Sequence, residues 1–211
     1  MAKMRKILAM VLAISMIAVF CVACGSDDAK EDATTKAAAA ADDATEAAED
    51  EGDAGFTEIP IFEDEEVAFM NVSAVYFQPV PMSDGTKAED YDIHLEADIA
   101  ALKNNFGYEL GSWIPYLTVD YKVADKDGKV AAEGTFMEMA ASDGPHYGAN
   151  IKLPDAGSYD LTITIHSPAE NDYLIHTDAL TGPGAQSFDE AFPDGTLSVT
   201  MPWDYEGPVS I

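Results

Sequence analysis

His94 and Glu96, separated by one residue, are side chains that together could chelate a metal ion. Side chains two residues apart on a β-strand point to the same face, about 7 Å apart at the backbone. This pattern predicts that the pair points outward, into solvent or a cleft, although the same spacing is also common by chance. The apolar residues that alternate with the pair take the core face: Ile93, Leu95, Ala97 and Ile99.

A methionine and a histidine flank a predicted turn further along the chain. A strand is expected to end near Met139, the turn follows at 143–145 (Asp-Gly-Pro), and His146 opens the next strand. Such a hairpin brings the Met139 thioether and the His146 imidazole together. These ligands suit Cu(I), or Cu(II) when a carboxylate joins them. The alternative is that Met137 and Met139 only fill the core.

The chain contains four histidines, and the other two have weaker signals. His166 ends a predicted strand on the face of Thr162 and Thr164, where a polar edge residue is expected. His176 lies in a predicted loop, a position at which histidine is more often a surface residue than a ligand.

The N-terminal residues predict export. Residues 1–23 combine a basic start with the apolar run 7–20, which is short for a membrane-spanning helix and is typical of a signal peptide. Cys24 follows small residues and precedes Gly-Ser, as in a bacterial lipobox, although Cys21 stands where an aliphatic residue is usual. We therefore expect a lipidated Cys24 outside the cytoplasm. The alternative, an uncleaved helical anchor, gives the same compartment.

The cysteine content limits the chemistry. The chain has two cysteines, Cys21 and Cys24. Processing would remove the first and acylate the second, leaving no thiol in the soluble domain. Disulfides, thiolate zinc sites, iron–sulfur clusters and blue-copper sites are then excluded. Any metal must be bound by His, Met, Asp or Glu.

Residues 24–56 are predicted to be a disordered acidic tether. The segment is rich in Ala, Asp and Glu, has no aromatic residue before Phe56, and cannot bury enough apolar surface to offset the entropy of ordering it. The whole chain carries a formal net charge of −28, and its one arginine is Arg5. Such a surface repels nucleic acids and anionic lipids, so no nucleic-acid partner is expected.

Residues 57–211 have the length of one domain and alternate apolar and polar residues with period two. Turn signals such as Asp127-Gly128 separate the runs, and no long amphipathic helix is evident. We predict an all-β, immunoglobulin-like β-sandwich. The expected strands are 67–77, 91–99, 114–124, 129–139, 147–153, 159–165 and 196–205.

Several long motifs then resemble the periplasmic iron-transport proteins. They include VYFQPV at 75–80, DIHLEADI at 92–99, ASDGPHYGAN at 141–150 and WDY at 203–205. That family is found beside iron permeases and includes a spirochaete membrane-antigen lipoprotein. The resemblance extends from Val67 to Tyr205, with departures such as Glu138, where a small residue or proline is common.

The resemblance implies a homodimeric immunoglobulin-like sandwich with a copper site, working with a membrane iron permease. Asp143 lies where an acidic residue is proposed to take part in iron binding. The positions that match the copper site of the family are His94, Glu96, Met139, His146 and His176.

Three functions are compatible with these residues. The first is an extracytoplasmic lipoprotein that binds copper and iron and serves iron uptake, which is a transport role rather than an enzymatic one. The second is a copper-dependent iron redox enzyme, although no second electron carrier is evident. The third is a surface lipoprotein that captures a metalloprotein. We favour the first.

Overall fold

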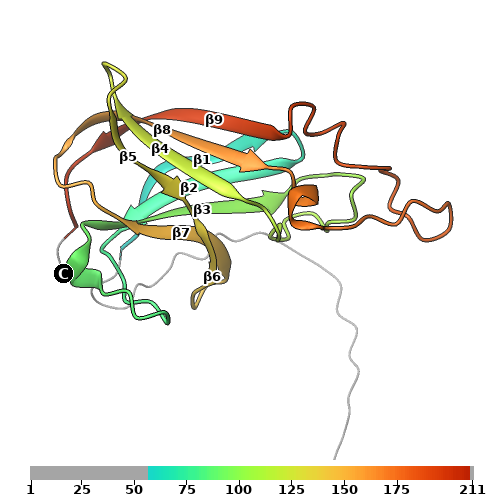
Figure 1. Ribbon diagram of the computed structural model, residues 1–211, viewed down its shortest axis with the longest axis horizontal. Helices are drawn as coiled ribbons and strands as arrows, with labels where there is room; N and C mark the ends of the chain where they lie inside the picture. The colour runs from blue at the N-terminus through green and yellow to red at the C-terminus, as the bar shows by residue number, and fades with distance from the viewer. Residues whose placement is uncertain (1–56, 210–211) are drawn as a thin grey trace, which may run out of the picture. The chain divides into compact units, whose positions relative to one another are not determined.

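The structure is a computed structural model that describes residues 57–209, and these residues form two antiparallel β-sheets (Figure 1). The first sheet has the strand order β1 (Ile59–Val67), β2 (Met70–Phe77), β3 (Ile93–Ala101), β7 (Pro145–Ile151) and β6 (Met137–Ala140). The second has the order β5 (Val130–Thr135), β4 (Val119–Asp125), β8 (Gly157–His166) and β9 (Thr196–Tyr205). Two short 3-10 helices, η1 (Ala88–Asp90) and η2 (Pro168–Asn171), lie in the connections. The prediction of an all-β, immunoglobulin-like sandwich is confirmed.

The core lies between the inner faces of the two sheets, as the alternation predicts. In β8, Leu161, Ile163 and Ile165 are fully buried, whereas the threonines between them face outward. In β3, the predicted core residues are equally buried. Because the two sheets bury their apolar faces against each other, His94 and Glu96 of β3 lie on the outer face of their sheet.

One edge strand was not predicted. β1 contains the acidic run 63–66, and its pairing with β2 is interrupted by register shifts between Pro60 and Phe62 and between Phe62 and Glu65. Asp64 has a positive φ of 59°. These irregularities break the period-two pattern, so the sequence signal for a strand is lost.

The predicted strand 129–139 is two strands that belong to different sheets. β5 pairs with β4, and β6 pairs with β7 in the other sheet. Phe136, 5 % exposed, lies at the crossing and donates its backbone N–H to Val119. This change of sheet is visible in Figure 1. It places Met139 in the first sheet, on the strand next to β7.

The remaining differences concern the ends of the chain and one loop. The predicted strand 114–124 begins only at Val119, because 102–118 form a loop connection with a single bridge at Trp113. The predicted signal peptide, Cys24 and the acidic tether lie outside the described residues. Within residues 57–209, no helix is long and apolar enough to cross a membrane.

Candidate metal centre

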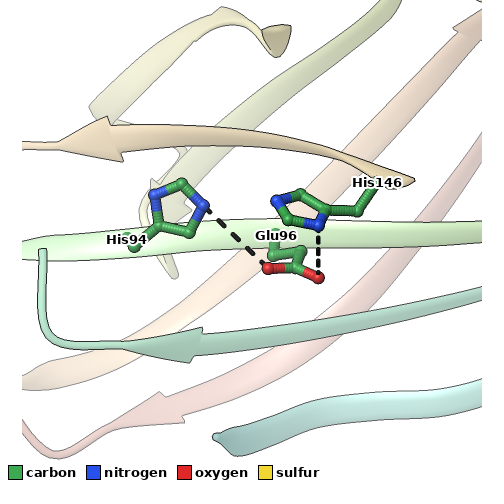
Figure 2. Close-up of side chains that lie close together, drawn as sticks. All are labelled: His94, Glu96 and His146. Atoms are coloured by element: carbon green, nitrogen blue, oxygen red, sulfur yellow. Dashed lines mark ion pairs between the residues drawn. The ribbon is translucent and has the colours of Figure 1, made fainter. Parts of the chain in front are cut away.

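Three side chains on the outer face of the first sheet form the candidate centre. His94 and Glu96 come from β3, and His146 comes from β7, its neighbour in the sheet. His94 Nε2 lies 4.0 Å from one carboxylate oxygen of Glu96, and His146 Nδ1 lies 3.3 Å from the other. Figure 2 shows the two imidazoles on either side of the carboxylate. One ligand atom from each residue lies within 4.8 Å of the others, which allows a single ion to contact all three.

The centre is buried although it faces away from the core. His94, Glu96 and His146 are 1 %, 3 % and 4 % exposed. The Phe77 ring packs on the His94 ring with centroids 4.9 Å apart. Val80, in the segment after β2, hydrogen-bonds to a side chain of β7. Because β3 lies between β2 and β7 in the sheet, this segment must cross β3. The predicted outward direction is therefore correct, but solvent does not reach the side chains.

Gly148 leaves open the space in front of the two imidazoles. It lies opposite Glu96 in the β3–β7 register. A Cβ atom at this position would lie 2.6 Å from His94 Nε2 and 3.3 Å from His146 Cδ2. The missing side chain thus provides a cradle between nitrogen ligands, and the residues present fit a bound transition metal. A glycine inside a strand is the sequence signal of such a close approach.

Burial controls the protonation of the centre. It lowers the pKa of His94 to about 4, against the opposing effect of a hydrogen bond to Asn150, and it also lowers the pKa of His146. Both imidazoles are therefore neutral near pH 7, the form in which histidine binds metals.

Glu96 has the opposite shift. Burial, followed by the charges of nearby acids, raises the pKa of Glu96 to about 8. The acids, in order of their effect, are Asp98, Glu58 and Asp143. The carboxyl group consequently holds a proton near pH 7 that a metal ion would displace.

Met139 lies directly opposite His146 in the β6–β7 register. Opposite residues of an antiparallel pair share a face, with Cβ atoms about 5 Å apart, so the thioether lies on the side of the centre. Met137 is 66 % exposed, and the alternative that it fills the core is wrong. Asp143 follows β6 in the turn and is near enough for its charge to raise the pKa of Glu96.

His176 lies away from this cluster. It is exposed in the loop between η2 and β9, and its Nδ1 lies 2.9 Å from Thr181 Oγ1. This loop packs on the connection after β3, where Ala185 donates a backbone hydrogen bond to Asn105. His94 and Ala101 mark the two ends of β3, about 23 Å apart. In Figure 1 the loop extends beyond the end to which the β3 arrow points. His94 lies near the other end of that strand.

His166 lies on the second sheet between two acids, as a polar residue outside the centre. Its Nε2 is 2.9 Å from Asp120, and its Nδ1 is 3.2 Å from Glu170. The two ring nitrogens face different carboxylates, so they do not converge with them on a common ion.

Comparison with known proteins gives the family. The sequence profile of a family described as Fe2+ transport protein matches residues 55–207. The chain belongs to this family. The resemblance found in the motifs is therefore confirmed.

Similar proteins give further detail. The chain is 39 % identical over 147 residues to the 34 kDa membrane antigen of Treponema pallidum, covering 66 % of this chain and 72 % of that protein. The copper-reconstituted P19 protein of Campylobacter jejuni is similar in structure, with a TM-score of 0.66 and 37 % identity over 73 % of this chain and 99 % of that one. FetP of uropathogenic Escherichia coli F11 has a TM-score of 0.64 and 42 % identity, covering 72 % and 99 %.

Proposed function

We propose that this protein binds copper at the buried cluster of His94, Glu96 and His146 and serves iron uptake. The observation that carries the proposal is a buried group of two neutral imidazoles and a carboxyl around the space left by Gly148. It occurs in a chain of the Fe2+ transport family, whose structural relative P19 was reconstituted with copper.

The ligand types favour copper over harder metals. Met139 opposite His146 adds a thioether, and a set of imidazole, thioether and carboxylate suits both Cu(I) and Cu(II). When bound, copper supplies one-electron chemistry and a positive charge next to buried acids. The side chains of this protein would hold the ion and exclude water. Neither imidazole would accept the proton displaced from Glu96, because burial lowers the pKa of both rings and keeps them neutral.

We propose that iron, as the transported ion, binds to acidic residues next to the copper site. Glu58, Asp98 and Asp143 each lie near enough to Glu96 to raise its pKa. Carboxylate oxygens are hard ligands that suit iron better than the thioether does. Asp143 also occupies the position that the family resemblance associates with iron.

We propose that His176 completes the centre of a second copy in a homodimer. His176 is remote from the cluster of its own chain, so it can reach a copper site only from a partner. Leu174 and Leu180 on the same loop are 85 % and 95 % exposed, which favours an apolar contact with another molecule. In a two-fold dimer, each loop would reach the centre of the other chain.

We further propose an extracytoplasmic location, with a lipid anchor at Cys24 and a membrane iron permease as partner. The lipobox-like sequence and the membrane-antigen relative support this location. The Cys24→Ser variant is expected to leave the membrane fraction, and a variant that remains there would contradict the anchor. Copper-dependent co-purification with the permease tests the partnership, and its absence would argue against it.

Metal titration of the purified full-length protein tests the function. We expect about one Cu(II) per chain and, on the copper-loaded protein, saturable iron binding. His94→Ala and His146→Ala should each weaken copper strongly, whereas His166→Ala should change it little because His166 lies on the other sheet. Equal copper affinity in all four proteins would refute the site.

A further inference from the structure

Asn150 lies behind His94, on the side away from the other ligands. It is the residue of β7 directly opposite His94 in the register. Its Oδ1 lies 2.9 Å from His94 Nδ1. The other ring nitrogen, Nε2, faces Glu96 and the space left by Gly148. The imidazole therefore lies between Asn150 and the metal centre.

The orientation of the Asn150 amide is determined by the backbone of Val80. Asn150 Nδ2 donates to the Val80 carbonyl at 2.6 Å, and the Val80 N–H donates to Asn150 Oδ1 at 3.2 Å. A flipped amide would oppose donor to donor and oxygen to oxygen, losing both hydrogen bonds at a cost of about 1 kcal/mol or more each. The oxygen is thus held toward His94.

The segment around Val80 is suited to this role. Pro79 and Pro81 have no N–H, so Val80 supplies the one backbone donor of the three residues. The two proline rings also restrict the backbone on either side of Val80. Asn150 is consequently braced by a stiff segment rather than by a mobile side chain.

An oxygen held against Nδ1 selects one tautomer of His94. Asn150 Oδ1 can only accept, so His94 Nδ1 carries the hydrogen and Nε2 presents its lone pair toward the centre. We propose that Asn150, through its paired contacts with Val80, is the positioning residue that sets the His94 tautomer and ring orientation for metal binding. This inference rests on the proposed copper function for its purpose, but the tautomer itself is a property of the metal-free protein.

The first test is long-range 1H–15N NMR of the imidazoles in the full-length, metal-free protein at pH 7. We expect His94 to carry its hydrogen on Nδ1 in the wild type. Asn150→Leu, which removes the acceptor, should give a mixture of tautomers or the Nε2–H form. Asn150→Asp keeps an acceptor and should retain the Nδ1–H form. A wild type with the Nε2–H form would overturn the proposal even if every variant failed to fold.

The second test is Cu(II) affinity in the same proteins. Asn150→Leu should bind about 10- to 100-fold more weakly, the usual effect of losing a partner of a ligating histidine, and Asn150→Asp should recover most of the loss. Asn104→Leu is the matched control, because Asn104 also bonds three backbone groups but lies beyond Ala101, at the end of β3 opposite to His94. Unchanged affinity in Asn150→Leu, or an equal loss in Asn104→Leu, would overturn the role of Asn150. A wild type that binds no copper would instead overturn the proposed function, while the NMR result would still decide the tautomer.

Discussion

At the scale of single residues, the burial of Glu96 links its protonation to metal binding. It is 3 % exposed, and it lies between two histidines that are themselves neutral near pH 7. A buried carboxylate without a nearby cation is unfavourable, so the group keeps its proton until an ion arrives. Metal binding at this centre is therefore an exchange of a proton for a cation.

This exchange predicts a specific pH dependence. With the pKa of Glu96 at about 8, Cu(II) must displace a proton below pH 8 and none above it. Affinity should therefore rise about tenfold per pH unit up to pH 8 and level off beyond. His94, with a pKa of about 4, adds a further loss only near and below pH 4. Titration calorimetry in buffers of different ionisation enthalpy measures the released proton. A flat profile between pH 6 and 8 would contradict the assignment to Glu96, as would the same slope in Glu96→Gln.

Gly148 gives a second prediction at this scale. Gly148→Ala would place a methyl group 2.6 Å from His94 Nε2, in the space of the ion, so copper affinity should fall by at least about 100-fold. Gly134→Ala is the matched control: its Cβ would meet the Tyr121 hydroxyl at 2.8 Å, at the end of a side chain on the other sheet. Competition titrations and thermal melts of both variants separate binding from stability. Equal copper affinity in Gly148→Ala and wild type would show that the ion lies elsewhere.

At the scale of elements, the short strand β6 determines which further ligand lies beside the histidines. It leaves the β5 strand at Phe136 and pairs with β7, so Met139 comes to lie opposite His146 and Met137 opposite Gly148. A strand that continued straight from β5 would have kept both methionines on the second sheet. The soft ligand of the centre thus depends on one change of sheet.

The two methionines of β6 should differ in their effect on copper. Met139→Ala should weaken Cu(I) by about tenfold or more and Cu(II) less, because the thioether is the soft ligand. Met137→Ala, two residues away on the same strand, is the control and should change both affinities little. Anaerobic competition with a Cu(I) chelator, beside Cu(II) titration, measures the pattern. A larger loss in Met137→Ala would assign the thioether to the other register position.

At the scale of the whole molecule, the loop that carries His176 and the buried centre lie toward opposite ends of β3. A single chain therefore does not bring His176 to its own centre. Leu174 and Leu180 give the loop an exposed apolar surface, which the dimer proposed above would cover. The proposed dimer would make copper affinity depend on the association of two chains.

Mixed dimers test this dependence. His94→Ala and His176→Ala should each bind copper weakly alone. If His176 acts across the dimer, a heterodimer of the two has one complete centre, with His94 from one chain and His176 from the other. Random exchange makes about half of the dimers heterodimers, so mixing equal amounts should restore about a quarter of the wild-type tight sites. The Leu174→Glu and Leu180→Glu double variant should sediment as a monomer and bind copper like His176→Ala. No recovery on mixing would contradict the shared site.

Local features of the chain were predictable because they depend on near neighbours along the sequence. The period of two in β3 and β8 is a property of any extended strand, so the core faces and the shared face of His94 and Glu96 followed from the pattern. The absence of thiols after Cys24 likewise limited the metal ligands by composition alone. The irregular, acidic β1 carried no such pattern and was missed.

Contacts between distant segments were decided by the tertiary structure alone. Which strands become neighbours depends on the packing of whole faces, and no local pattern records it. The β3–β7 register places Gly148 opposite Glu96, and the hydrogen bonds with Val80 fix the Asn150 amide beside His94. Burial then sets the charge of each ligand, because desolvation acts only once the surrounding chain has closed over the site. The sequence by itself therefore determined which groups could bind a metal, and the fold determined which of them meet within one chain and in what protonation state.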